Sequence, residues 1–293
     1  MLFRSPAERR TAKSSVRVQP VPTAQCSVLP REGGLQKERD WLRRNLSKQY
    51  DATASSVARL MSEYPGLRAG SSASDTDVLT DLVALRLYLT GKIGGLDDAV
   101  RAGKVGPHVP LARCVASGLR RLPSYRGPLR TRASLTEEQV RWYGARGLVT
   151  EWSFLPAVAS GELELPGTAE ILIWSMSARR TGLLDPSRPD QVVFQPGTSF
   201  KVLGAEAGEE GPRIRLRELT RTEVAPDGTV QSVPALDEFA VSVLEEAGKA
   251  WRQEDPVQRL PADRQDWFAS PPGLLAHPAR VGATGSAQEG VRA

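Results

Sequence analysis

The chain has 293 residues, 40% of them hydrophobic, which is enough for one main folded domain with tails. Its net charge of +5 comes from 39 Lys and Arg against 34 Asp and Glu, and this excess is spread along the chain. The spread argues against a nucleic-acid binder, which needs basic residues clustered on one face. No apolar run approaches the roughly 18 residues of a membrane span, so we expect a soluble, cytoplasmic protein. The preference for Arg, Ala, Gly, Pro and Val indicates a G+C-rich genome, interpreted here as bacterial.

Cysteine and histidine are too few and too scattered to predict a metal site. The chain contains only Cys26, Cys114, His108 and His277, and their spacing matches no metal-binding motif. Cys114 lies on the apolar side of a predicted helix, which favours core packing over a reactive thiol. We therefore expect no metal and no disulfide framework.

The two ends of the chain are predicted to be disordered. Residues 1–32 mix Arg, Ser, Pro and Gln without periodicity, and residues 254–293 are rich in Pro, Ala and Gly. Neither stretch can offset its ordering entropy by apolar burial. The pair Trp267-Phe268 is an exception that could dock back on the domain, which is predicted to span residues 33–253.

Helical periodicity fills the first part of this domain, residues 33–122. Apolar residues at steps of three and four predict helices over 35–46, 57–64, 78–89 and 110–122. Pro65-Gly66 ends the second helix, and Ser74-Asp75 are cap candidates for the third. The leucine stripes of these helices are interpreted as the core of a helical lobe.

After Pro123 the period changes, and residues 123–253 are predicted to form a sheet lobe with a final helix. Short strands are predicted over 128–133, 149–154, 169–175 and 213–217, and the continuous apolar run of the third indicates a buried central strand. A helix is expected over 135–144, with Ser134 and Glu137 in the spacing of a capping box, and another over 236–252. The predicted fold class is α+β, with a helical lobe packed on an antiparallel sheet lobe.

The stretch 190–203 contains two strand patterns joined by a turn. Gln191 to Phe194 is a β-rich run, and Phe200 to Leu203 alternates apolar with polar residues. Pro196-Gly197 between them predicts a hairpin or a short loop that connects neighbouring strands.

Three phrases, in this order, resemble the mono-ADP-ribosyltransferase domain over residues 75–205. Leu119-Arg-Arg-Leu-Pro-Ser-Tyr-Arg-Gly127 is similar to the Leu-Pro-x-Tyr-x-Gly phrase that leads into the family's first active-site strand. Ile171-Leu-Ile-Trp-Ser175 looks like its middle strand, and the stretch 189–203 looks like its last motif, which runs through Pro-Gly-Thr to Phe-x-Val. The resemblance implies a helical lobe on an antiparallel sheet, and a cleft in which members bind NAD.

In that family an Arg on the first strand contacts NAD phosphate, a Ser-Thr-Ser strand braces the nicotinamide side, and the second Glu of a Glu-x-Glu pair stabilises the ribosyl cation. Here the Arg position falls on Thr131, and the Ser-Thr-Ser phrase is replaced by 156–158, Pro-Ala-Val, behind Phe154. The Glu-x-Glu pair falls on 189–191, Pro-Asp-Gln. The resemblance thus implies catalytic candidates at Gln191 and Asp190. The cofactor-binding candidates that it implies are Arg126, Arg130, Thr131, Arg132 and Phe154.

Three functions are compatible with this pattern. The first is a diverged, catalytically silent ADP-ribosyltransferase fold that serves as a binding or scaffold module, needs no cofactor and is compatible with a protein partner. The second is an active NAD-dependent ADP-ribosyltransferase or NAD glycohydrolase with a displaced constellation, such as Arg126 or Arg132 with Asp190. The third is an unrelated α+β protein. Under the first, we expect Gln191 to point into the cleft where the family's Glu would lie.

Overall fold

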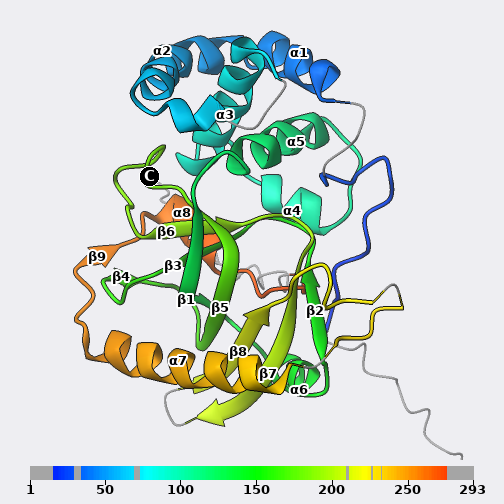
Figure 1. Cartoon of the computed structure of the whole chain (residues 1–293), viewed down its shortest axis with the longest axis vertical. Coiled ribbons are helices and arrows are strands. Elements are labelled where there is room, and N and C mark those ends of the chain that lie inside the picture. Colours follow the sequence, from blue (N-terminus) through cyan, green and yellow to red (C-terminus); the bar gives the residue numbers. More distant parts are fainter. Residues whose placement is uncertain are drawn as a thin grey trace, which may run out of the picture.

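The computed structural model describes residues 16–29, 34–68, 73–208, 211–225, 227–231 and 233–275, and it places a helical lobe over a sheet lobe (Figure 1). The two lobes follow the change of period after Pro123, since every described element before this residue is helical and the strand β1 begins directly after it. Within the described residues, no helix is both long and apolar enough to cross a bilayer. No group of three or more metal-binding side chains occurs in that part of the chain either.

The helical lobe is built around one central helix. Its elements are α1 (Gln36–Asn45), α2 (Ser47–Glu63), the short 3-10 helix η1 (Pro65–Arg68), α3 (Asp75–Leu89), α4 (Leu96–Arg101) and α5 (His108–Leu119). Helix α3 is buried on most sides because α1, α2 and α5 pack around it. The Ser74 hydroxyl caps α3 by accepting from the Asp77 amide, as the sequence indicated. Helix α4 was not predicted, because six residues are too few to show a periodic stripe.

The sheet lobe has one seven-stranded sheet in the order β1-β3-β6-β5-β8-β7-β2. The strands are β1 (Ser124–Ala133), β2 (Leu148–Glu151), β3 (Leu155–Val158), β5 (Ala169–Arg180), β6 (Gln191–Phe194), β7 (Thr198–Gly208) and β8 (Gly211–Glu218). All of its pairs are antiparallel except β5 with β8. Because β1 also pairs with β5, the strands β1, β3, β6 and β5 form a closed ring. A small parallel pair joins β4 (Leu163–Glu164) to β9 (Gln258–Arg259).

Strands β6 and β7 are joined by a short loop but are not neighbours, so the prediction of a hairpin or of neighbouring strands is wrong. Strand β6 pairs with β3 and β5, whereas β7 pairs with β2 and β8. The chain therefore crosses from one side of the sheet to the other at Pro196-Gly197. Gly197 has a φ of 80° and donates its amide to the Glu151 carbonyl at 2.7 Å, and a Cβ here would meet Leu29 Cδ2 at 2.6 Å. Only glycine fits this crossing without strain.

Two helices complete the sheet lobe. Helix α7 (Pro234–Gln253) covers one face of β5, where Leu244 and Trp251 pack against Leu172 and Trp174. Helix α6 (Glu137–Gly144) begins two residues later than expected. Its capping box is formed by Thr136 with Gln139, because the strand β1 runs to Ala133 and leaves Ser134 outside the first turn. The predicted box of Ser134 and Glu137 is therefore wrong.

Parts of both predicted tails are folded against the domain, so the boundaries at residues 32 and 254 are wrong for these parts. Val18 forms a β-bridge with Leu274, and residues 258–275 include β9 and α8 (Ala262–Phe268). Cys26 and Phe268 are 4% and 1% exposed. Apolar burial by a few scattered side chains thus orders segments whose average composition predicted disorder. Residues 1–15, 30–32 and 276–293 of the predicted tails lie outside the described residues, as does His277.

Candidate functional site

The three positions that the resemblance singled out meet at one place in the sheet. Arg130 on β1 lies opposite Val158 on β3, and Val158 in turn lies opposite Gln191 on β6. Thr131 follows Arg130 directly, so the position of the family's Arg, the last position of its Ser-Thr-Ser phrase and the position of its second Glu are grouped on three adjoining strands. We call Thr131, residues 156–158 and Gln191 the motif cluster.

The motif cluster is buried and carries no charged side chain. Thr131 is 0% exposed, and its hydroxyl donates to the Phe268 carbonyl at 3.3 Å. Gln191 is 1% exposed; its side-chain nitrogen donates to the Thr181 hydroxyl at 3.2 Å, and its Oε1 has no partner among the described residues. The expectation that Gln191 faces an open cleft is wrong in this structure. Neither a diphosphate nor a developing cation would find an opposite charge on these side chains.

The C-terminal part of the described chain covers the motif cluster. Helix α8 lies beside β1 and β3, and the side chain of Phe268 packs with Val158 and with leucines of the β4 region and of the chain just before α8. The neighbouring Trp267 donates its indole N–H to the Tyr88 hydroxyl at 2.7 Å, which ties α8 to α3. The predicted docking of Trp267-Phe268 is confirmed. We call residues 262–275 the covering segment.

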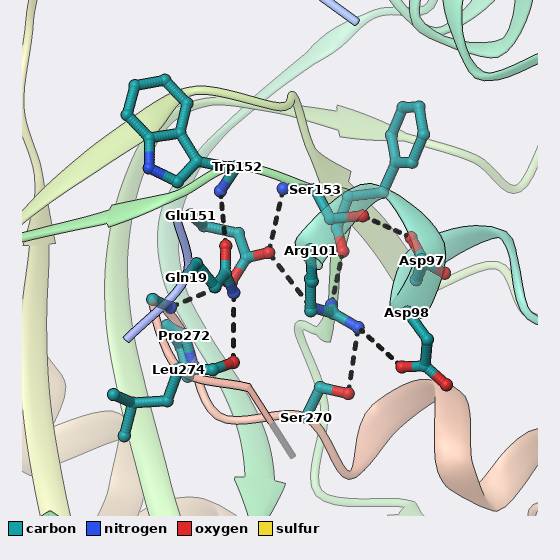
Figure 2. Close-up of polar contacts among 12 residues, drawn as sticks. Gln19, Asp97, Asp98, Arg101, Glu151, Trp152, Ser153, Ser270, Pro272 and Leu274 are labelled. Atoms are coloured by element: carbon teal, nitrogen blue, oxygen red, sulfur yellow. Dashed lines mark hydrogen bonds and ion pairs between the residues drawn. The ribbon is translucent and has the colours of Figure 1, made fainter. Parts of the chain in front are cut away.

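A buried polar network fixes the covering segment to both lobes (Figure 2). Glu151, at the end of β2, is fully buried, and its Oε1 accepts from Arg101 Nε at 3.1 Å and from the Ser153 amide at 3.0 Å. Its Oε2 accepts from Gln19 Nε2 at 2.8 Å and from the Gly273 amide at 3.0 Å. The carboxylate of Glu151 thus connects a helix of the helical lobe, the sheet and both terminal segments.

Arg101 extends the same network from α4. Its guanidinium donates to the Ser270 hydroxyl at 3.0 Å and to the Phe154 carbonyl at 2.9 Å, and it is 2% exposed. A buried ion pair of this kind needs all its donors and acceptors satisfied, since an unpaired buried charge is costly. No sequence pattern predicts this network, because Arg101 lies in a helix of six residues and Gln19 in a segment without periodicity.

Asp97, a buried carboxyl group on α4, connects this network to Tyr88 on α3. Asp97 accepts from the Tyr88 hydroxyl at 3.0 Å and from the Ser153 hydroxyl at 2.9 Å. Burial raises the pKa of Asp97, although the nearby Arg101 guanidinium opposes this shift. Burial likewise raises the pKa of Tyr88 well above its usual value. These groups are held in place by packing and hydrogen bonds, and they line one side of a pocket of about 270 Å³ between α4 and α8.

Phe154 belongs to the core and not to an open site. The side chain is 0% exposed, and its ring centroid lies 5.0 Å from that of Tyr88. Its carbonyl is occupied by Arg101. Stacking with a cofactor, which the resemblance implied, would require the helical lobe to move away.

The three arginines of β1 differ in their contacts and in their exposure. The guanidinium of Arg130 donates to the carbonyls of Ser160 and Gly161 and thereby fixes the loop that follows β3. Arg132 lies with it beside a pocket of about 280 Å³, whose other charged residues come from β4, β5, β8, α7 and the residue that follows α7. Arg126 is exposed, and its side chain makes no hydrogen bond or ion pair with the rest of the described chain.

Asp190 is exposed, and its backbone carbonyl accepts from the Ala159 amide, next to the pair of Val158 and Gln191. Burial raises the pKa of Tyr125; the Arg180 guanidinium opposes this rise and the charge of Asp190 adds to it. Among the described residues, no side-chain hydrogen bond or ion pair joins Asp190 to Arg126 or to Arg132, the two displaced pairs that the sequence suggested.

Comparison with known proteins identifies the fold. No family model matches the chain, and no curated protein sequence matches it either. Among solved structures, the type III effector XopAI of Xanthomonas axonopodis pv. citri is 20% identical; its N-terminally truncated form aligns over 63% of this chain and 88% of its own, with a TM-score of 0.53. A second XopAI structure, also 20% identical, aligns over 67% of this chain and 86% of its own, with a TM-score of 0.52.

The ADP-ribosyltransferase HopU1 of Pseudomonas syringae pv. tomato is 14% identical, aligns over 63% of this chain and 97% of its own, and has a TM-score of 0.50. At these identities the likeness concerns the fold alone. The predicted α+β class, with a helical lobe on a sheet lobe of ADP-ribosyltransferase type, is confirmed. The chain therefore has an ADP-ribosyltransferase-like fold.

Proposed function

We propose that this chain is a diverged ADP-ribosyltransferase-like domain that is catalytically silent and acts as a binding or scaffold module. The observation that carries the proposal is the motif cluster, in which Thr131, Val158 and Gln191 come together on adjoining strands without a guanidinium or a carboxylate. We also retain the predictions that the protein is bacterial, cytoplasmic and able to bind a protein partner.

The chemistry of ADP-ribosyl transfer explains why this composition matters. A diphosphate is bound best by a forked guanidinium, and Thr131 offers only a hydroxyl that the Phe268 carbonyl already occupies. An oxocarbenium-like transition state needs a fixed anion, and the amide of Gln191 carries no charge. Loss of such a carboxylate removes several kcal/mol of transition-state stabilisation.

The covering segment supports the same conclusion by geometry. NAD could reach the motif cluster only if Phe268 and the residues after it left their positions. Those residues are held by the Glu151 network and by the bond from Trp267 to Tyr88. Binding of NAD would therefore have to offset the loss of this packing, which lowers its apparent affinity.

One alternative keeps a specific observation in its favour. Arg126 and Asp190 are both exposed, and neither side chain makes a hydrogen bond or ion pair within the described residues, so they could hold NAD outside the motif cluster. An active transferase or NAD glycohydrolase would then use these two residues in place of Thr131 and Gln191.

Calorimetric titration with NAD tests the proposal directly. We expect no measurable binding by the wild type at millimolar NAD, and micromolar binding would overturn the proposal. If binding is found, Arg126→Gln and Asp190→Asn should abolish it under the alternative. Arg44→Gln is a matched control, because Arg44 is an exposed arginine on α1, away from both residues.

A further inference from the structure

A second pocket lies at the opposite end of β6 from Gln191. It has a volume of about 490 Å³ and is lined by residues from the end of α5, the segment after β2, β5, the β6–β7 loop and the end of β8. Its polar wall contains Arg120, Arg179, Gln195, Glu218 and Arg221, and Trp152 forms an aromatic wall. We call it the arginine pocket.

Three arginines face one carboxylate in this pocket, and that carboxylate is already occupied. Glu218 accepts hydrogen bonds from the Ser175 hydroxyl and from the amides of Met176 and Ser177, at the point where β5 separates from β8. Arg120 and Arg221 are exposed, and neither side chain makes a hydrogen bond or ion pair with another residue in the described part of the chain. The pocket therefore holds three guanidinium groups against one carboxylate, which leaves a net positive charge.

Two donors in the wall also lack acceptors. Arg179 is fixed by a bond of 2.9 Å from its guanidinium to the Leu122 carbonyl, but its Nε is buried and unpaired, as is the side-chain nitrogen of Gln195. Burial lowers the pKa of Arg179, the charge of Arg120 adds to this shift, and the carboxylate of Glu218 opposes it. Unpaired buried donors and adjacent like charges are both unfavourable, and an anion in the pocket would relieve both.

Trp152 lies in the pocket wall because consecutive side chains at residues 151–153 point to opposite sides of the chain. Glu151 and Ser153 point into that network, and the indole of the intervening Trp152 points away from it (Figure 2). The ring is half-buried and lies 3.8 Å from the Cβ position that Gly197 lacks, with Leu29 beside it. A flat, partly exposed ring next to guanidinium groups is suited to stacking with a planar ligand.

We propose that the arginine pocket binds a small phosphorylated compound with a planar ring, of about the size of a mononucleotide. The guanidinium groups of Arg120, Arg179 and Arg221 would hold the phosphate oxygens, and Trp152 would stack on the ring. The site is separate from the motif cluster, because Gln191 begins β6 whereas Gln195 follows the last residue of this strand. It does not depend on whether the cleft is active.

Calorimetric titration of the full chain with AMP at low ionic strength tests this proposal, with adenosine and inorganic phosphate as partial ligands. We expect the wild type to bind AMP at one site per chain and to bind both partial ligands more weakly. Arg120→Gln and Arg221→Gln should each weaken AMP binding roughly tenfold or more, since each removes a charged donor. Trp152→Leu should weaken binding of AMP but not of phosphate, and Arg44→Gln should change nothing.

Three results would overturn the proposal: no AMP binding by the wild type at millimolar concentration, equal binding of AMP and adenosine, or unchanged AMP binding in both arginine variants. Thermal unfolding of each variant shows whether it is folded, and these exposed arginines are expected to leave the unfolding temperature within a few degrees of wild type. The arginine variants leave the motif cluster and the covering segment intact. A negative result therefore refutes ligand binding in the arginine pocket and leaves the proposal that the motif cluster is catalytically silent unaffected.

Discussion

Replacing Glu151 with Gln should destabilise the protein and release both terminal segments from the sheet. The carboxylate of Glu151 accepts from Arg101 and Ser153 through one oxygen, and from Gln19 and Gly273 through the other. Glutamine has the same shape, but one of these oxygens becomes an NH2 group. The two protein donors that now bond to that oxygen would then meet another donor. Arg101 would lose its buried ion-pair partner and keep only the exposed Asp98, at 4.0 Å.

The magnitude follows from this burial. Glu151 and Arg101 are 0% and 2% exposed, and removing one partner of such a buried pair costs about 3–5 kcal/mol. The lost acceptor adds a penalty of about 1–3 kcal/mol for each unsatisfied donor, but these contributions overlap and should not be summed. We therefore expect a loss of at least about 3 kcal/mol, a large part of the 5–15 kcal/mol that is typical of a folded domain.

Urea unfolding of the wild type and of Glu151→Gln measures this loss. Glu63→Gln is the control: its side chain is 53% exposed and lies 3.9 Å from Arg59, so it should cost less than about 1 kcal/mol. The double variant with Arg101→Gln should lose less than the sum of the single variants, and hydrogen exchange at the Gly273 amide should accelerate in Glu151→Gln. A loss below about 1 kcal/mol, or additive losses, would refute the reasoning.

Three further predictions concern the core. Burial raises the pKa of Asp97 from 3.8, so the folded state keeps the proton of this carboxyl group to a higher pH than the unfolded state does. The unfolding free energy of the wild type should therefore fall, relative to that of Asp97→Asn, as the pH rises from 3.8 through the raised pKa. A relative gain with rising pH would contradict this. Burial also raises the pKa of the Cys114 thiol and encloses it, so a thiol reagent should modify Cys114 only after urea unfolding, and rapid modification of the native protein would be inconsistent with the packing. A Cβ at Gly118 would lie 2.4 Å from the Asp81 carbonyl oxygen, so Gly118→Ala should lower the unfolding free energy by about 1–3 kcal/mol. Gly147 has open space around it, so Gly147→Ala is the control and should cost less than about 1 kcal/mol. Equal costs would show that α3 and α5 can separate freely.

The sequence predicted the elements whose periodicity is long and regular. The leucine stripe from Val78 to Leu89 became the buried α3, and the apolar run from Ala169 to Ser175 became the core of β5. Strand partners were harder to predict, because partners are set by tertiary contacts. Gln191–Phe194 and Phe200–Leu203 look like a hairpin in sequence, but Gly197 lets the chain cross the sheet instead.

The position of the candidate site could be predicted from the sequence, but its coverage by the C-terminal segment could not. The spacing of the family phrases placed Thr131, Val158 and Gln191, and the strand register brings these positions together. The covering segment could not be foreseen from composition, since it is ordered by a few isolated contacts. Its connection to Glu151 and Arg101 depends on residues far apart in the chain, and no local pattern marks such a network.

Nicotinamide release from NAD is the most direct test of the proposal that the motif cluster is silent. The wild type and the Gln191→Glu variant should release no more nicotinamide than a sample without protein, with HopU1 as the positive control. A carboxylate at position 191 alone should not restore turnover, because Thr131 and Val158 also lack the family's groups and residues of one constellation are strongly non-additive. Turnover by Gln191→Glu would show that the other two positions had been misassigned, and turnover by the wild type would contradict the account outright.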